Sequence, residues 1–125
     1  MAVDFIEQTK VDALAVCIGN VHGHYQGEPK LDFERLESIQ KLISIPLVLH
    51  GASGLSDSFI HRSIDCGVRK FNVNTEVREA YLAALQTSLQ EERKPDLIEV
   101  MNDAIQAMQA VVVSKLRLFR SSGKA

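Results

Sequence analysis

The sequence predicts an α/β fold in which parallel strands alternate with helices. Three short apolar runs, each bounded by Gly, Pro or polar residues, have the length of buried strands. Helical patterns separate these runs, and strict alternation is typical of right-handed parallel crossovers in an α/β barrel or a doubly wound sheet. No linker or low-complexity tract divides the chain, so we expect one domain over residues 1–125.

The expected strands cover residues 13–18, 46–49 and 68–73. None of them alternates apolar and polar residues over a long stretch. This pattern indicates parallel strands that are covered on both faces.

The expected helices have recognisable ends. Residues 3–9 have the pattern of a helix that leads into the first strand, and Gly67 can end the helix before the third strand. Pro95 breaks the chain ahead of the last helix, where Glu99 gives a capping-box-like start. Four helices follow residues whose side chains can cap them: Asp32, Ser56, Thr75 and Asp96.

Composition excludes several classes of partner and location. The formal charge is −2 and basic residues do not cluster, so nucleic acid is not an expected partner. No apolar run approaches the roughly 20 residues that cross a bilayer, and the N-terminus lacks the layout of a signal peptide. Cys17 and Cys66 form no C-x-x-C motif and are expected to be reduced packing residues. We therefore expect a cytoplasmic chain with no membrane contact.

Polar residues and glycines follow each expected strand, at residues 19–25, 50–54 and 72–75. Parallel strands place their carboxyl ends on the same rim, so these three clusters can converge on one ligand. Function is therefore expected at this rim.

Two histidines stand at equivalent positions in this arrangement. His22 and His50 each follow a strand and precede a glycine. Neutral imidazole is a good zinc ligand, so the pair can hold a metal; the alternative is a pair of hydrogen-bonded rim histidines. His24 is expected to be exposed in its loop and His61 to lie on a helix surface.

The other rim residues suit a phosphate or a polar ligand. Residues 51–54 (Gly-Ala-Ser-Gly) run into a helix N-terminus, where backbone N–H groups bind anions and Ser53 adds a hydroxyl donor. A bare turn is the alternative. Asn72 and Asn74 face the same side of the third strand, which predicts either a polar ligand or a hydrogen-bonded network between strands.

The sequences at residues 15–25, 46–54 and 70–76, together with the tail at 115–125, resemble the class II, zinc-dependent ketose-bisphosphate aldolases. These enzymes act on fructose or tagatose 1,6-bisphosphate. The resemblance covers essentially the whole chain. It implies a TIM (β/α)₈ barrel, of which this chain is the C-terminal portion with about three strands and their helices.

The resemblance also implies a reaction: cleavage of a ketose bisphosphate to dihydroxyacetone phosphate and an aldehyde, with zinc as the Lewis acid. By the motifs, His22 and His50 correspond to two of three zinc ligands. A monovalent cation is expected near the phosphate, with ligands that the motifs do not place here. The residues expected to bind substrate are Gly23, Gly51, Ser53, Asn72, Val73, Asn74 and Thr75.

The chain departs from the family pattern in two ways. Asn20, Ala52, Asn74 and Arg120 stand where the family commonly has other residues, and the changes at Asn20, Ala52 and Asn74 leave the substrate preference open. More importantly, no residue matches the third zinc ligand or the acid/base Asp, so no catalytic residue is assigned to this chain. A barrel needs about 250 residues. We therefore expect the isolated chain to bind zinc weakly and to catalyse little.

Two other functions fit the sequence. The chain can be a non-catalytic module that binds phosphorylated metabolites or assembles with itself or with the other half of a barrel. Three parallel strands leave two edges to pair, which favours such association. The third reading is a phosphate-binding barrel fragment with unrelated chemistry.

Overall fold

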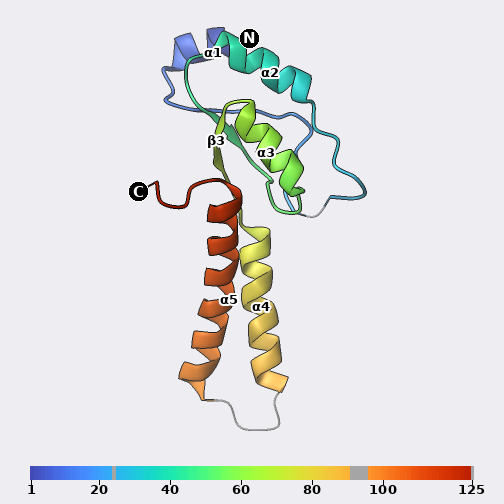
Figure 1. Ribbon diagram of the computed structural model, residues 1–125, viewed down its shortest axis with the longest axis vertical. Coiled ribbons are helices and arrows are strands. Elements are labelled where there is room, and N and C mark those ends of the chain that lie inside the picture. Colours follow the sequence, from blue (N-terminus) through green and yellow to red (C-terminus); the bar gives the residue numbers. More distant parts are fainter. Residues whose placement is uncertain (24, 91–95, 125) are drawn as a thin grey trace. The chain divides into compact units, whose positions relative to one another are not determined.

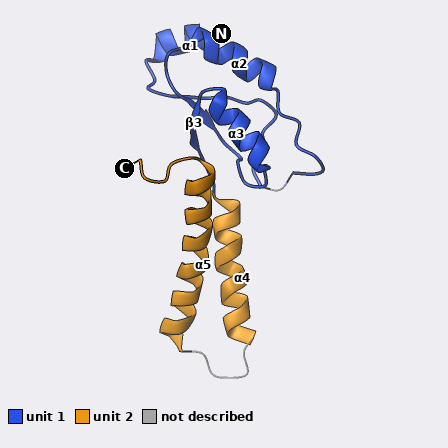
Figure 2. Cartoon of the chain, in the orientation of Figure 1, with its two compact units in different colours: residues 1–73 blue, residues 74–125 orange. Residues whose placement is uncertain are grey.

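The computed structural model describes residues 1–23, 25–90 and 96–124, and it divides into two compact units, Met1–Val73 and Asn74–Ala125 (Figure 1, Figure 2). The expected alternation of helices and strands is present. Pro95 lies outside the described residues. The elements are α1 (Ala2–Thr9), β1 (Leu14–Ala15), α2 (Phe33–Leu42), β2 (Leu47–Leu49), α3 (Asp57–Asp65), β3 (Val68–Phe71), α4 (Thr75–Gln90) and α5 (Leu97–Leu118).

The first unit contains a three-stranded sheet whose strands are parallel, as predicted, and lie in the order β1-β2-β3. Leu47 pairs with Leu14 of β1 on one side and with Val68 of β3 on the other. All of β2 is buried, whereas β1 and β3 keep exposed positions. The expectation of strands covered on both faces therefore holds for β2 and is wrong for β1 and β3, because both contain exposed side chains.

Apolar side chains from the sheet and its helices form the core of this unit. Beside it, the rings of Phe33 and Phe59 stack with centres 5.8 Å apart, which joins α2 to α3. The Arg62 guanidinium lies over Phe33, 4.2 Å from the ring centre, and pairs with Glu37 at 3.6 Å. In this unit the core residues with 1% exposure or less are Ile18, Leu36, Leu47, Leu49, Ala52, Ile60, Ser63 and Val68.

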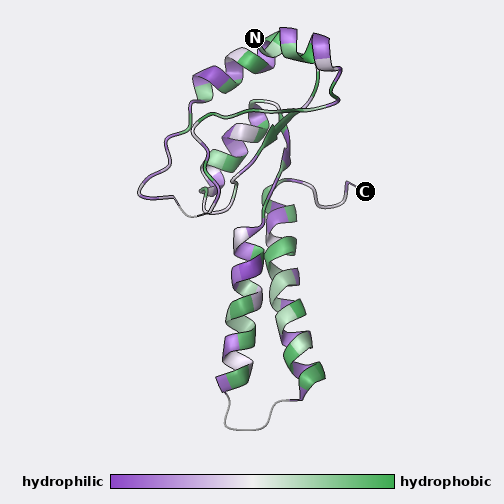
Figure 3. Cartoon of the chain, turned by 180° about the vertical axis from the view of Figure 1, so that it is seen from behind, coloured by the Kyte–Doolittle hydropathy of each residue, from purple (hydrophilic) through white to green (hydrophobic). Residues whose placement is uncertain are grey.

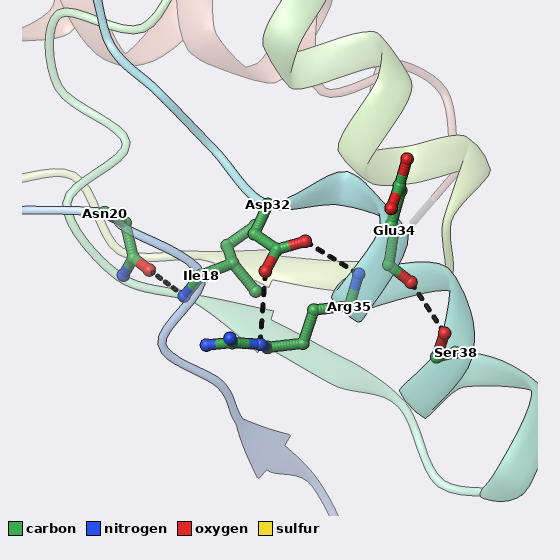
Figure 4. Close-up of polar contacts among 6 residues, drawn as sticks. All are labelled: Ile18, Asn20, Asp32, Glu34, Arg35 and Ser38. Carbon is green, nitrogen blue, oxygen red and sulfur yellow. Dashed lines mark hydrogen bonds and ion pairs between the residues drawn. The ribbon is translucent and has the colours of Figure 1, made fainter.

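Side chains cap three helices as predicted. The Asp32 cap is drawn in Figure 4. Thr75 was expected to cap α4, but it is the first residue of that helix. The preceding carbonyl, that of Asn74, accepts a hydrogen bond from the Arg78 N–H at 3.0 Å, so the helix begins one residue earlier than the cap required. The capping carboxylate or hydroxyl oxygens and their backbone donors are Asp32 with Arg35 (2.9 Å), Ser56 with Phe59 (3.5 Å) and Asp96 with Ile98 (2.8 Å).

The second unit is a hairpin of α4 and α5. The Ser88 hydroxyl donates to Asp103 at 3.1 Å, and Glu76 pairs with Lys115. Because these two contacts join opposite ends of each helix, the helices are antiparallel. None of the described helices is long and apolar enough to cross a membrane.

Many large apolar side chains of this hairpin are exposed. Figure 3 marks the hydrophobic residues of both helices in green along the ribbon. A shallow groove of about 550 Å³ on α5 is lined by Ile105, Met108, Gln109, Val112 and Val113. The exposed side chains are Leu82, Leu89, Leu97, Ile98, Met101, Ile105, Val112, Val113 and Leu116.

Candidate functional site

The two predicted metal ligands lie side by side at the carboxyl end of the sheet. His50 directly follows β2, and His22 lies in the loop after β1. Their ring centres are 5.6 Å apart, and the ring planes make an angle of 73°. His50 is half-buried and His22 is exposed, so solvent reaches the pair.

Asn72 is in direct contact with His50. Its amide nitrogen lies 3.1 Å from each of the two ring nitrogens, and its side-chain oxygen accepts a hydrogen bond from Lys70. The Asn72 N–H donates to the Leu49 carbonyl at 3.1 Å, which fixes its backbone beside the end of β2. A hydrogen-bonded network, one of the two alternatives that the sequence left open, is therefore present at Asn72.

The glycine-containing loop at residues 51–54 begins against the loop that carries His22. Gly51 has a φ of +64°, and a Cβ atom there would lie 1.9 Å from the Val21 carbonyl oxygen. Ser53 is buried with 5% exposure. The loop leads into α3, whose first turn contains the acidic residue Asp57. The start of α3 therefore offers backbone donors, but one negative charge already lies there.

The remaining predicted residues lie in different places. Gly23 has a φ of +87°, and nothing would lie within 4 Å of a Cβ atom at this position. Val73, half-buried, is the last residue of the first unit, while Asn74 and Thr75 open the second unit. His24 lies outside the described residues.

The possible metal ligands are few in the described part of the chain. No group of three His, Cys, Asp or Glu side chains there is arranged to hold a metal ion. His61, predicted to lie on a helix surface, is half-buried on α3. A metal at this rim would therefore depend on His22 and His50 for its protein ligands in this part of the chain.

Sequence reasoning missed two residues that join the rim loops. The Asn20 side chain accepts from the Ile18 N–H at 2.9 Å and donates to the His50 carbonyl at 3.0 Å. The Tyr25 hydroxyl donates to the Gly51 carbonyl at 3.0 Å. These contacts connect positions 30 and 26 residues apart, so no local pattern predicts them. Asn20 was noticeable only as a departure from the family.

The two cysteines differ in environment, and both are free. Cys66 is buried beside α2 and its thiol donates to Glu37 at 3.7 Å. Burial, and next the Glu37 carboxylate, raise the pKa of the Cys66 thiol. Cys17 is exposed, so the expectation that it packs in the core was wrong. It follows β1, the short strand whose own positions are half-buried and exposed.

Comparison with known proteins finds two similar proteins that are both named aldolases. A Bacillus subtilis (strain 168) protein named 6-phospho-5-dehydro-2-deoxy-D-gluconate aldolase is 43% identical over 123 residues, covering 96% of this chain and 42% of that protein. A Geobacillus stearothermophilus protein named fructose-bisphosphate aldolase is 42% identical over 123 residues, covering 98% of this chain and 43% of that protein. This chain thus spans less than half the length of the curated relatives it matches.

A solved structure agrees with these relatives. The crystal structure of the YdjI aldolase from Escherichia coli K12 superposes with a TM-score of 0.87 and 36% identity, covering 99% of this chain and 44% of that one. The family model described as fructose-bisphosphate aldolase class-II matches residues 1–124. Sequence motifs, fold and relatives agree, and the chain belongs to the class II fructose-bisphosphate aldolase family.

Proposed function

We propose that this chain forms part of a zinc-dependent aldolase that cleaves a ketose 1,6-bisphosphate, or forms it from dihydroxyacetone phosphate and an aldehyde. The observation that carries the proposal is the His22–His50 pair at the sheet end, with the loop at 51–54 beside it. In this proposal the chain supplies two zinc ligands and the phosphate loop. The third ligand and the acid/base Asp come from residues that this chain does not contain.

The geometry of the histidine pair fits a zinc ion. Zinc binds imidazole nitrogen at about 2.0–2.1 Å in a tetrahedral arrangement, which holds two ring centres about 5 Å apart. The observed 5.6 Å is close to that separation. When bound, zinc would polarise the ketone oxygen of the substrate. Asn72 presents its amide nitrogen, a donor, to both ring nitrogens of His50, so it would have to turn its side-chain oxygen toward the ring to accept the N–H that a zinc-bound imidazole donates.

The loop at residues 51–54 would bind the phosphate of dihydroxyacetone phosphate. Positive φ angles at Gly51 and Gly54 turn the backbone sharply just before α3. Backbone N–H groups at such a turn and helix start are natural phosphate donors. Gly23, Ser53, Asn72, Val73, Asn74 and Thr75 are proposed to complete the substrate site, and a monovalent cation to lie near the phosphate.

Other members of the family suggest which sugars to test. Fructose and tagatose 1,6-bisphosphate both carry a ketone next to a phosphorylated carbon. The compound named for the Bacillus subtilis relative has the same feature, because its 5-dehydro and 6-phospho positions are adjacent. All three therefore belong in one substrate panel.

We further propose that residues 1–125 are the C-terminal part of a TIM-barrel domain, because β1, β2 and β3 are parallel neighbours in chain order. The strand edges and the exposed apolar side chains of α5 favour association with a second copy or with the rest of a barrel. The free cysteines suit the reducing cytoplasm, which is the proposed location.

Zinc titration by calorimetry tests the site. We expect the chain to bind zinc weakly and to lose binding in both His22→Ala and His50→Ala, whereas His61→Ala, on α3, serves as the matched control and keeps it. Zinc binding that survives both rim substitutions would show that the proposed ligands are wrong. Robust metal-dependent cleavage of the substrate panel by the purified chain would contradict the absence of an acid/base residue.

The alternative function is a non-catalytic module that binds phosphorylated metabolites. It is supported by the lack of a third metal ligand near His22 and His50 among the described residues. Titration with dihydroxyacetone phosphate distinguishes the two. Affinity that is unchanged by zinc and by His22→Ala supports the module. Affinity that requires zinc and is lost in both rim variants supports the aldolase site.

A further inference from the structure

Two side chains fasten the loop that carries His22 to the segment that carries His50. The first is Asn20. Its amide oxygen accepts from the Ile18 N–H, a bond drawn in Figure 4, and its amide nitrogen donates to the His50 carbonyl. Asn20 therefore links the end of β1 directly to the backbone of the proposed ligand His50. Both of its polar groups are used in this link.

The second side chain is Tyr25, on the other side of His22 in the sequence. Its hydroxyl donates to the Gly51 carbonyl at 3.0 Å and accepts from the Val21 N–H at 3.4 Å. The bond to Gly51 is partly buried, whereas the bond from Val21 is exposed. One phenol oxygen thus holds both loops at the point where they meet.

The backbones of the two loops are also in direct contact between these links. The 1.9 Å gap between a Cβ at Gly51 and the Val21 oxygen leaves no room for any side chain. His22 lies between Asn20 and Tyr25 in the sequence. The Asn20 side chain donates to the His50 carbonyl and the Tyr25 hydroxyl donates to the Gly51 carbonyl. Both imidazoles therefore extend from segments that are joined at three points.

We propose that Asn20 and Tyr25 are positioning residues, which hold His22 and His50 at the separation that a shared metal ion requires. This inference rests on the proposed zinc site. Asn20 and Tyr25 touch neither metal nor substrate in this role. They act through the backbone, by removing the loop motion that would otherwise separate the two rings. Supporting residues around metal ligands typically change metal affinity about 10- to 100-fold when they are lost.

The test compares Tyr25→Phe and Asn20→Ala with controls elsewhere in the chain. Tyr25→Phe removes one oxygen and keeps the ring. Tyr81→Phe on α4 and Asn102→Ala, at an exposed position of α5, make the same chemical changes in the second unit. We expect calorimetry to show about tenfold weaker zinc binding in each rim variant. The two controls should bind zinc like the unaltered chain.

A second readout needs no metal. In the metal-free chain, rings whose centres are 5.6 Å apart should give a nuclear Overhauser contact between His22 and His50. We expect this contact to weaken in both rim variants and to persist in both controls. A residue that only stabilised the fold would lower the melting temperature without changing the ring contact or the zinc affinity of the folded chain.

The outcomes separate this inference from the proposed function. If the unaltered chain binds no zinc, the proposed function fails, and the ring contact alone decides whether Asn20 and Tyr25 position the histidines. If zinc binds and depends on His22 and His50, but neither rim variant changes the affinity by more than twofold, the positioning role is overturned. An unchanged ring contact in both variants overturns it as well.

Discussion

Replacing Gly51 by Ala should destabilise the first unit far more than an ordinary glycine substitution. The φ of +64° costs an alanine about 1 kcal/mol, because the left-handed region crowds its Cβ. The same Cβ would lie 1.9 Å from the Val21 oxygen and 2.7 Å from the Val21 carbonyl carbon. These are backbone atoms, so no side chain can rotate to relieve the clash, and overpacking adds about 1–3 kcal/mol. The expected loss is about 2–4 kcal/mol.

Gly27→Ala is the matched control for this substitution. Gly27 has a φ of +89°, and nothing would lie within 4 Å of a Cβ there. It therefore carries the conformational cost without the clash, and we expect a loss of about 1 kcal/mol. Urea denaturation followed by circular dichroism measures both free energies of unfolding. Equal losses in the two variants, within about 0.5 kcal/mol, would refute the claim that the loops meet this closely.

Three further predictions concern charge, pH and the helix hairpin. Asp57→Asn removes the negative charge in the first turn of α3, where a charge contributes about 0.3–1 kcal/mol, so the affinity for dihydroxyacetone phosphate should rise about two- to fivefold. Asp65→Asn at the other end of α3 is the control, and an unchanged affinity in Asp57→Asn would exclude this helix as the phosphate site. Because the pKa of Cys66 is raised in the folded chain, the unfolded chain loses its thiol proton first, and stability should fall as pH rises above about 8.5. Urea midpoints between pH 7 and 10 should show a smaller fall in Cys66→Ala, and identical pH dependence in both chains would contradict the assignment. Ser88→Ala should cost about 1 kcal/mol by leaving Asp103 without this donor, whereas exposed Thr87→Ala should cost less, and thermal melts that show the reverse order would argue against the contact.

The sequence predicted the parallel sheet and the histidine pair because both follow from short-range patterns. Apolar runs marked β2 and β3, and a histidine after each of two strand ends placed the rings on one rim. Capping side chains such as Asp32 and Ser56 also act over three residues, so they were predicted correctly. The cap predicted at Thr75 was wrong because a residue with a hydroxyl near a helix start can lie either just before the helix or in its first turn.

Contacts between distant loops could not be predicted in this way. Tyr25 meets Gly51 only because β1 and β2 are adjacent, and the phenol itself gives no sign of its partner. The exposure of Cys17 depends on what covers the faces of the assembled sheet, because strand side chains point out of the plane of the sheet. Such features require the tertiary arrangement rather than residue spacing.

The register of the sheet has a consequence for the order of folding. β1 pairs residue 14 with residue 47, and β2 pairs residue 47 with residue 68, so both pairings close long loops. Non-local pairings of this kind form slowly, whereas neighbouring helices form early. The α4–α5 hairpin should therefore appear before the sheet in a refolding experiment. The histidine pair can form only after the slower pairing of β1 with β2. A metal ion that needs both rings would therefore bind late in folding and would stabilise the completed sheet.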